Sequence, residues 1–172
     1  GHYKSDGSIC TEADVAAQEA LVEKLQKIYP GKIVSEEILA AQNIDQWNSG
    51  DEGLWCIDPI DGTTNFVNGI PYFAVSVALM NHGRSVLGVV YDPIADEMFY
   101  AEKGKGAFLN NVKLPVKEYT PTAFEGAIAG VDLKRLNNKL AARISTAPPC
   151  SSQRNFGASA LDWCFTAAGR FD

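Results

Sequence analysis

The stretch that most constrains this chain joins an apolar run to two closely spaced aspartates. Residues 54–57 are apolar and predict a buried strand that ends at Asp58. Pro59 has no N–H to give to a β-ladder, so we expect the strand to stop there. Asp61 comes three residues after the first aspartate and just before Gly62, whose missing Cβ permits a tight turn and the close approach of a ligand. The sequence therefore predicts two carboxylates that converge at a strand end.

The oxygen donors of this loop favour a hard divalent cation. Ile60 lies between the aspartates and can offer its backbone carbonyl, and such oxygen ligands suit Mg²⁺ or Mn²⁺ better than Zn²⁺. If residues 62–66 open a helix, the free N–H groups at Gly62 and Thr63 face the same point and favour a phosphate. The plainer alternative is a capped turn, in which Asp61 only caps the next helix.

Two other acidic motifs are excluded by the spacing. An EF-hand loop needs acids at alternate positions and a glycine at its sixth position, and Pro59 and the early Gly62 break that pattern. Aspartyl-phosphate phosphatases use two aspartates two residues apart on an extended strand. Here Asp58 and Asp61 are three residues apart across a proline.

Composition is ordinary for a globular chain and argues against two classes of partner. The 172 residues suffice for a sizeable core, with 46% hydrophobic and 21% charged residues. The net charge of −6, without a basic stripe, argues against nucleic acid, and no apolar run is long enough for a membrane span. This acid excess disfavours anionic substrates unless bound cations reverse the local charge. The 4 cysteines form no C-x-x-C pair, so we expect buried thiols in a reducing cytoplasm.

The segments before the loop carry helix and strand signals. Thr11 is a candidate N-cap for the helix that follows it, and residues 32–35 predict a short strand. Glu36 and Glu37 come next. Such a pair is usually solvated, but at the end of a buried strand the second carboxylate could turn toward a cation. Residues 38–53 are polar and irregular, so we expect a surface loop.

The second half of the chain predicts a β-meander followed by two helices. The segments 73–80, 85–91 and 97–101 read as strands joined by turns, and with a glycine-rich turn leading to Phe108 they indicate antiparallel pairing. The later elements that we expect are a strand at 127–131, a helix at 133–144 and a final helix that ends near Gly169.

Several motifs together resemble those of a known enzyme family. The string Asp-Pro-Ile-Asp-Gly-Thr-Thr-Asn-Phe at 58–66 closely resembles the signature of the inositol monophosphatase-like family, which are metal-dependent, lithium-sensitive sugar phosphatases. The family pattern K-x-D-x-x-x-T-x-x-D is matched by Lys4, Asp6, Thr11 and Asp14. Its S/G-E-E string is matched at 35–37, and its R-x-x-G-S/T-A-A-L string resembles residues 154–161.

The resemblance implies a role for each matched position. As metal ligands it implies Glu37, Asp58, the Ile60 carbonyl and Asp61, and as catalytic residues Asp14, Thr63 and Glu37, with Asp14 hydrogen-bonded to Thr63. As substrate-binding residues it implies Ile60, Asp61, Gly62, Thr63, Gly157, Ala158 and Ser159. The implied cofactor is Mg²⁺, with Mn²⁺ as a substitute.

The resemblance also implies the fold class. We expect a layered α/β fold of the α+β type, with a large, mainly antiparallel sheet flanked by helices. Residues 1–172 would form a single, incomplete domain, because the family continues past G-R-x-D into a second sheet with a W-D-x-A-A-G string. The C-terminal subdomain and the family's N-terminal helix would then be absent.

The substrate is left open by the sequence. The Thr-Asn-Phe at 64–66 resembles the inositol-phosphate branch, and the expected partner is a small phosphorylated metabolite, with a homodimer as a family expectation. A 3′-phosphonucleotide, fructose bisphosphate and histidinol phosphate remain alternatives. A different class of function, a non-catalytic fragment with a structural or regulatory role, also remains open.

Overall fold

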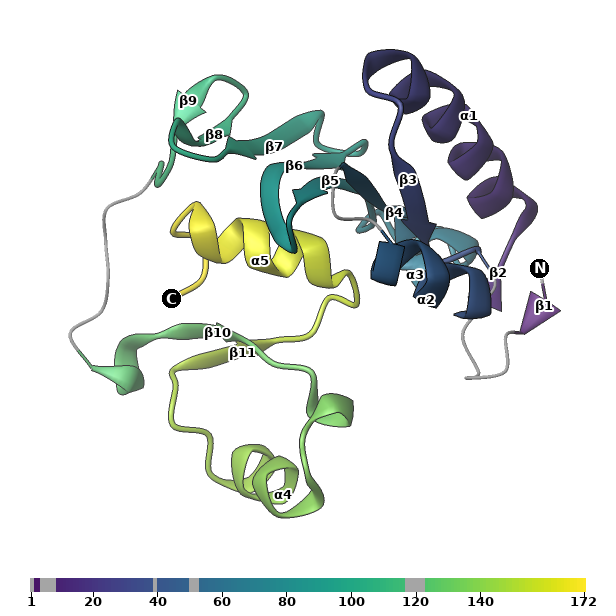
Figure 1. The fold of residues 1–172 in the computed structure, drawn as a ribbon. Helices are drawn as coiled ribbons and strands as arrows, with labels where there is room; N and C mark the ends of the chain where they lie inside the picture. The colour runs from purple at the N-terminus through teal and green to yellow at the C-terminus, as the bar shows by residue number, and fades with distance from the viewer. Residues whose placement is uncertain (1, 4–8, 39, 50–52, 117–122) are drawn as a thin grey trace.

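Seven strands form the sheet that carries the candidate site (Figure 1). The computed structural model describes residues 2–3, 9–38, 40–49, 53–116 and 123–172. In order across the sheet, the strands are β3 (Lys32–Ser35), β4 (Leu54–Asp61), β5 (Ala74–Asn81), β6 (Arg84–Asp92), β7 (Glu97–Glu102), β8 (Gly106–Leu109) and β9 (Val112–Lys113). Within this sheet only β3 and β4 run parallel, so the expected layered α/β fold with a mainly antiparallel sheet is confirmed.

The remaining elements flank this sheet or form small pairs beside it. Two short pairs are β1 (His2–Tyr3) with β2 (Ile9–Cys10) and β10 (Ile128–Gly130) with β11 (Ser152–Arg154). The helices are α1 (Glu12–Ile28), α2 (Ala40–Ser49), α3 (Thr63–Val67), α4 (Asn138–Thr146) and α5 (Ser159–Ala167), with single 3₁₀ turns η1 (Phe124–Gly126) and η2 (Leu133–Arg135). Among the described residues, no helix combines the length and apolar character that crossing a bilayer requires.

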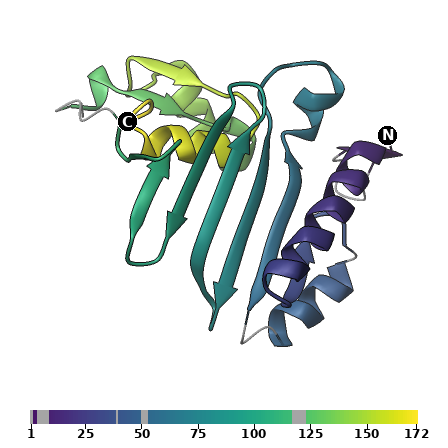
Figure 2. The same ribbon diagram turned by 90° about the horizontal axis from the view of Figure 1, so that it is seen from above.

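Strand register places α1 and α5 on different faces of the sheet. Trp55 donates from its indole to the carbonyl of Tyr29 at the end of α1, so this residue faces α1. Phe99 pairs with Val90 and lies in the core cluster beneath α5. Successive pairings connect Val90 through Ser76 to Asp58, so Asp58 lies on the α5 face. Figure 2 shows the two helices on different sides of the strands.

Strand β4 continues through Pro59, so the prediction that it ends at Asp58 was wrong. The pairing with β5 is interrupted between Asp58 and Asp61, and Pro59 falls in that interruption. A proline that has no N–H to donate is tolerated there because the ladder needs no donor at that point.

Two other predicted segments also need correction. Residues 40–49 form α2 rather than a loop, because Asn43 donates to the Ser35 and Ile38 carbonyls and accepts from the Ser35 N–H, which anchors the polar helix to β3. The helix predicted at 133–144 is divided into η2 and α4, because Asn137 is extended and caps α4 through the N–H of Leu140. The described cysteines Cys56, Cys150 and Cys164 are free and half-buried, not fully buried.

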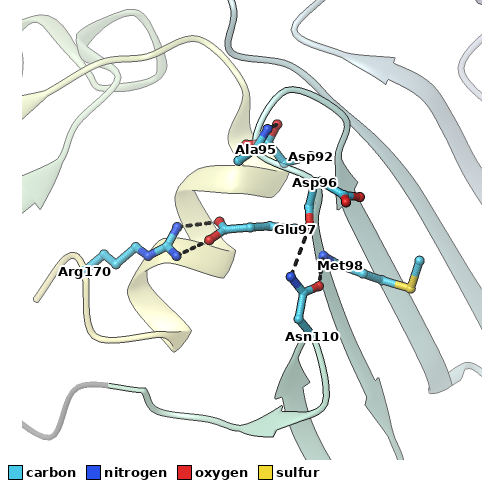
Figure 3. A network of polar contacts seen from close by, with 7 residues as sticks. All are labelled: Asp92, Ala95, Asp96, Glu97, Met98, Asn110 and Arg170. Atoms are coloured by element: carbon cyan, nitrogen blue, oxygen red, sulfur yellow. Dashed lines mark hydrogen bonds and ion pairs between the residues drawn. The ribbon is translucent and has the colours of Figure 1, made fainter.

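A polar network joins the end of α5 to the start of β7 (Figure 3). The guanidinium of Arg170 donates to both oxygens of Glu97, at 2.7 and 2.5 Å, and lies 4.6 Å from the centre of the Phe165 ring. The Asn110 side chain accepts from the Met98 N–H and donates to the Asp96 carbonyl, which closes the turn between β6 and β7 against the end of β8. These contacts fix α5 on the sheet face that Asp58 shares.

Candidate active site

The parallel pairing of β3 with β4 brings acidic residues together at the strand ends. Ser35 is paired with Ile57, and the Glu36 N–H donates to the Ile57 carbonyl at 3.3 Å, so Glu36 comes beside Asp58. The Oδ1 atom of Asp58 is buried and accepts no hydrogen bond. Burial, together with the carboxylates of Glu36 and Asp61, raises the pKa of Asp58 to about 7. The site thus holds a poorly solvated carboxylate among like charges.

Asp61 is held by the start of α5. Its Oδ2 accepts from the Ala160 N–H at 2.6 Å, and its Oδ1 lies 3.4 Å from the Ser159 hydroxyl, which donates to it. The N-cap residue of α5, Ala158, has no side chain that could satisfy these N–H groups, so Asp61 caps the helix from a distant part of the chain. Burial raises the pKa of Asp61, although these hydrogen bonds oppose the shift. The capping alternative is therefore partly realised, but on α5 and not on α3.

Thr63 is oriented by the first turn of α1. Asp14 is only 1% exposed, and its Oδ2 accepts from the backbone N–H and the hydroxyl of Thr11. The Thr11 Oγ1 in turn accepts from the Asp14 N–H, which completes a capping box. The Thr63 hydroxyl lies 3.3 Å from Asp14 Oδ1 and 3.0 Å from the Ile60 carbonyl. This is the Asp14–Thr63 contact that the resemblance implied. The matching positions Lys4 and Asp6 lie outside the described residues.

Gly62 allows the loop to approach the segment before α5. Its φ of +93° lies in the left-handed region. A Cβ there would lie 3.1 Å from Ala158 Cβ and 3.2 Å from the Tyr72 carbonyl oxygen. Glycine therefore suits this position, because a side chain would be strained by the backbone conformation and tight against Ala158 and Tyr72.

The predicted substrate segment is partly accessible. Gly157, with φ of +83°, and Ser159 are exposed, whereas Ala158 has no exposed surface and packs against Gly62. The backbone and side chain of Ala158 are therefore covered in this conformation. Its neighbours Gly157 and Ser159 have exposed surface that a ligand could contact.

Glu37 occupies the turn after β3, where the Ile38 N–H donates to the Ser35 carbonyl. Within the described part of the chain, no three acidic, histidine or cysteine side chains are grouped as a metal site requires. The assignment of Glu37 as a ligand and catalytic residue therefore stays a prediction. Sequence reasoning missed Glu36, which the β3–β4 register places beside Asp58, although the S/G-E-E string contained it.

The donors at the end of β4 fit a divalent cation. A buried carboxylate oxygen without a hydrogen bond is costly, and a nearby cation would offset both its desolvation and the repulsion from Glu36 and Asp61. Asp58, Asp61 and the Ile60 carbonyl supply only oxygen atoms, which suits Mg²⁺.

Comparisons with known proteins agree with this geometry. The inositol monophosphatase family matches residues 1–172. The Nus factor SuhB of Pasteurella multocida (strain Pm70) is 39% identical over 173 residues, which cover 98% of this chain and 63% of that protein. The inositol-1-monophosphatase of Mesorhizobium japonicum (strain LMG 29417 / CECT 9101 / MAFF 303099) is 35% identical with the same coverage.

A solved structure of a related phosphatase has a similar fold. The crystal structure of an IMPase/NADP phosphatase complexed with Mg²⁺ and phosphate superposes with a TM-score of 0.83 at 26% identity, over 99% of this chain and 62% of that one. The chain thus spans about three fifths of the length of the relatives it matches, 63% for the first two. A family match over the full length of the chain, with these relatives and this fold, means that the protein belongs to the inositol monophosphatase family.

Proposed function

We propose that this protein is a Mg²⁺-dependent phosphomonoester hydrolase that acts on inositol monophosphate or a related sugar phosphate. The observation that carries this proposal is the buried Oδ1 of Asp58, which accepts no hydrogen bond and lies beside the carboxylate of Asp61. A phosphatase of this family needs a cation at such a point. The IMPase/NADP phosphatase complex with Mg²⁺ and phosphate supports the choice of metal.

Glu37, Asp58 and the Ile60 carbonyl would hold one cation, with Glu37 turning inward from the turn after β3, and Asp58 and Asp61 would begin a second site. When bound, Mg²⁺ supplies Lewis acidity, which lowers the pKa of water and neutralises charge on phosphoryl oxygens. Asp14 holds the Thr63 hydroxyl in one direction, so this hydroxyl orients the attacking water in line with the scissile bond. Mn²⁺ is proposed as a substitute metal.

The substrate would lie between the end of β4 and the segment before α5. The N–H groups of Gly62 and Thr63 would bind phosphoryl oxygens, and Ile60 and Asp61 would border the phosphate. The exposed Gly157 and Ser159 would contact the sugar hydroxyls. Ala158 would take part only after its covered surface opens, because it has no exposed area.

Phosphate release tests this proposal. The protein is incubated with Mg²⁺ and with each of inositol 1-phosphate, a 3′-phosphonucleotide, fructose 1,6-bisphosphate and histidinol phosphate. We expect turnover of inositol 1-phosphate that EDTA abolishes and that Asp58→Asn lowers by about 10³-fold, in the range for loss of an essential electrostatic group. No release from any of the four, with Mg²⁺ bound, contradicts the proposal.

A second candidate is a non-catalytic role, which the resemblance to a protein named as a Nus factor favours. Such a protein would retain the fold as a structural or regulatory part. It would bind Mg²⁺, or fail to bind it, without turning over any phosphomonoester, whereas the first candidate requires both binding and turnover.

A further inference from the structure

Two side chains of the β4–α3 junction, residues 58–67, hold the segment that leads into α5 at both of its ends: Asp61 ends β4 and Asn65 lies on α3. The carboxylate of Asp61 accepts from the Ala160 N–H at 2.6 Å. The side-chain amide of Asn65 donates to the Phe156 carbonyl at 2.6 Å. The tripeptide Gly157–Ser159 lies between these two contacts, so the β4–α3 junction fixes it from both sides. The two segments are more than 90 residues apart in sequence.

Asn65 makes this connection with both protons of one NH₂ group. It lies on α3, is 8% exposed, and its Nδ2 also donates to the Tyr72 carbonyl at 2.7 Å. Two carbonyl oxygens thus converge on a single donor atom, and only a side-chain amide offers two donors at this reach. An aspartate of the same shape would present an acceptor to two acceptors.

The bond to Phe156 acts next to Gly157, an exposed residue of the predicted substrate segment. Gly157 follows directly, in the left-handed conformation, and a Cβ on it would lie 3.3 Å from Asn65 Nδ2. The carboxamide therefore lies against the backbone of Gly157 itself. A shift of Asn65 would move this backbone relative to Asp58 and Asp61.

We propose that Asn65 is a positioning residue. It sets the distance between the β4–α3 junction, which carries Asp58 and Asp61, and the Gly157–Ser159 backbone, and so determines substrate affinity without touching the substrate. This rests on the proposed phosphatase function. Asp61 has the same mechanical role at the other end, but it is also a candidate metal ligand. Asn65 is therefore the place where positioning can be tested separately.

Asn68 provides a matched control. It lies near the end of the same short segment, is exposed, and its side-chain amide donates to the Thr64 carbonyl at 2.7 Å. Its removal also loses a hydrogen bond from an asparagine to a backbone carbonyl, but this bond joins only α3 and its C-cap residue. An effect of an Asn65 variant that Asn68→Ala does not share then comes from the bonds of Asn65 to Phe156 and Tyr72, and exchange at residues 156–160 reports on the bond to Phe156.

The experiment compares Asn65→Asp, Asn65→Ser and Asn68→Ala with the wild type in three measurements. These are steady-state kinetics on inositol 1-phosphate, Mg²⁺ titration without substrate, and hydrogen exchange of residues 156–160. For both Asn65 variants we expect KM to rise roughly tenfold or more with kcat changed less, because misplacement of a binding segment weakens substrate contacts. The Ala160 amide should exchange faster, and Asn68→Ala should match the wild type.

The proposal is overturned if a folded Asn65 variant keeps the wild-type KM and the wild-type exchange at 156–160, or if Asn68→Ala changes both equally. If Asn65→Asp does not fold, Asn65→Ser decides, because its hydroxyl keeps a donor but cannot bond both carbonyls. If the wild type hydrolyses no phosphomonoester, the proposed function fails. The exchange measurement then decides alone whether Asn65 fixes the segment.

Discussion

At the scale of single residues, the burial of Asp58 determines how the protein should respond to pH. Its pKa is raised to about 7 by burial first, then by Glu36 and Asp61. The folded-state pKa is thus above the unfolded value. In the metal-free protein the unfolded chain releases this proton first, and the contribution of Asp58 to stability becomes less favourable as the pH rises from about 4 through 7.

The first prediction follows from this loss of stability with rising pH. In EDTA, Asp58→Asn should stabilise the fold relative to the wild type by about 2–3 kcal/mol more at pH 8 than at pH 5, since the amide stays neutral at both. Urea denaturation of both proteins at the two pH values measures the difference. An equal gap at pH 5 and pH 8 would mean that Asp58 is not a poorly solvated carboxylate.

The second prediction separates chemistry from folding at Thr63. Thr63→Val keeps the shape but removes the hydroxyl that lies near Asp14 and the Ile60 carbonyl. We expect phosphate release to fall at least about 100-fold, with stability lowered by only about 1–2 kcal/mol. Thr64→Val, at the exposed neighbouring threonine, is the control and should retain activity. Equal activity of the two variants would remove Thr63 from the mechanism.

Single residues were predictable where the partner is local or the motif is specific. Thr11 was identified as an N-cap because the N–H groups from which its side chain accepts, those of Ala13 and Asp14, lie within three residues. The proximity of Glu36 to Asp58 was not predictable, since it depends on the parallel register of Ser35 with Ile57. Which glutamate faces the aspartate is therefore decided by strand pairing and not by the motif.

At the scale of elements, the junction of β4 and α3 depends on a glycine whose positive φ and close neighbours disfavour a side chain. The third prediction compares Gly62→Ala with Gly69→Ala. Both glycines have positive φ, +93° and +67°, but a methyl group would meet other atoms within 4 Å at Gly62 and none at Gly69. We expect Gly69→Ala to cost about 1 kcal/mol from backbone strain, and Gly62→Ala a further 1–3 kcal/mol, roughly, from crowding against Ala158 and Tyr72.

Chemical denaturation of the two alanine variants measures this difference. If they lose the same stability, the contact of Gly62 with the segment before α5 contributes nothing beyond the backbone conformation. The packing described for Ala158 would then be wrong.

Elements with strong local signals were predicted well, and those held by tertiary contacts were not. The meander from β5 to β8 has apolar runs separated by turn residues, so its strands were identified within a few residues. Helix α2 was missed because its sequence is polar and because it is held by a tertiary contact, in which Asn43 of the helix bonds the N–H and the carbonyl of Ser35 in β3. The continuation of β4 through Pro59 depended on a gap in the ladder that the sequence does not reveal.

At the scale of the whole molecule, a partly buried ion pair holds α5 and the last residues on the sheet. Arg170 and Glu97 are 33% and 20% exposed, and hydrogen bonding to Glu97 raises the pKa of the Arg170 guanidinium. The fourth prediction is that Arg170→Met lowers the free energy of unfolding by about 1–3 kcal/mol, because it leaves a half-buried carboxylate without its bidentate partner.

Lys27→Met is the control for this variant. Lys27 and Glu23 are about 70% exposed, so their pair should contribute at most about 0.5 kcal/mol. Thermal or urea denaturation compares the two. A loss for Arg170→Met no larger than for Lys27→Met would show that the pair does not anchor α5.

The layered α/β class of the molecule followed from the sequence, through its family motifs and the meander. The contacts between the β4–α3 junction and the segment that leads into α5 could not be predicted, because Asn65 and Asp61 bond Phe156 and Ala160 across more than 90 residues. No local pattern indicates such contacts. They arise only when α5 is packed against the sheet face that Asp58 shares.

The most direct test of the account is calorimetric titration of the metal-free wild type with Mg²⁺ at pH 8, beside Asp58→Asn. We predict one or more saturable sites in the wild type, with affinity at least about tenfold weaker in the variant, because the buried Asp58 carboxylate loses the charge that binds the cation. Equal binding by both proteins, or no binding by the wild type, would contradict the assignment of this loop as the metal centre.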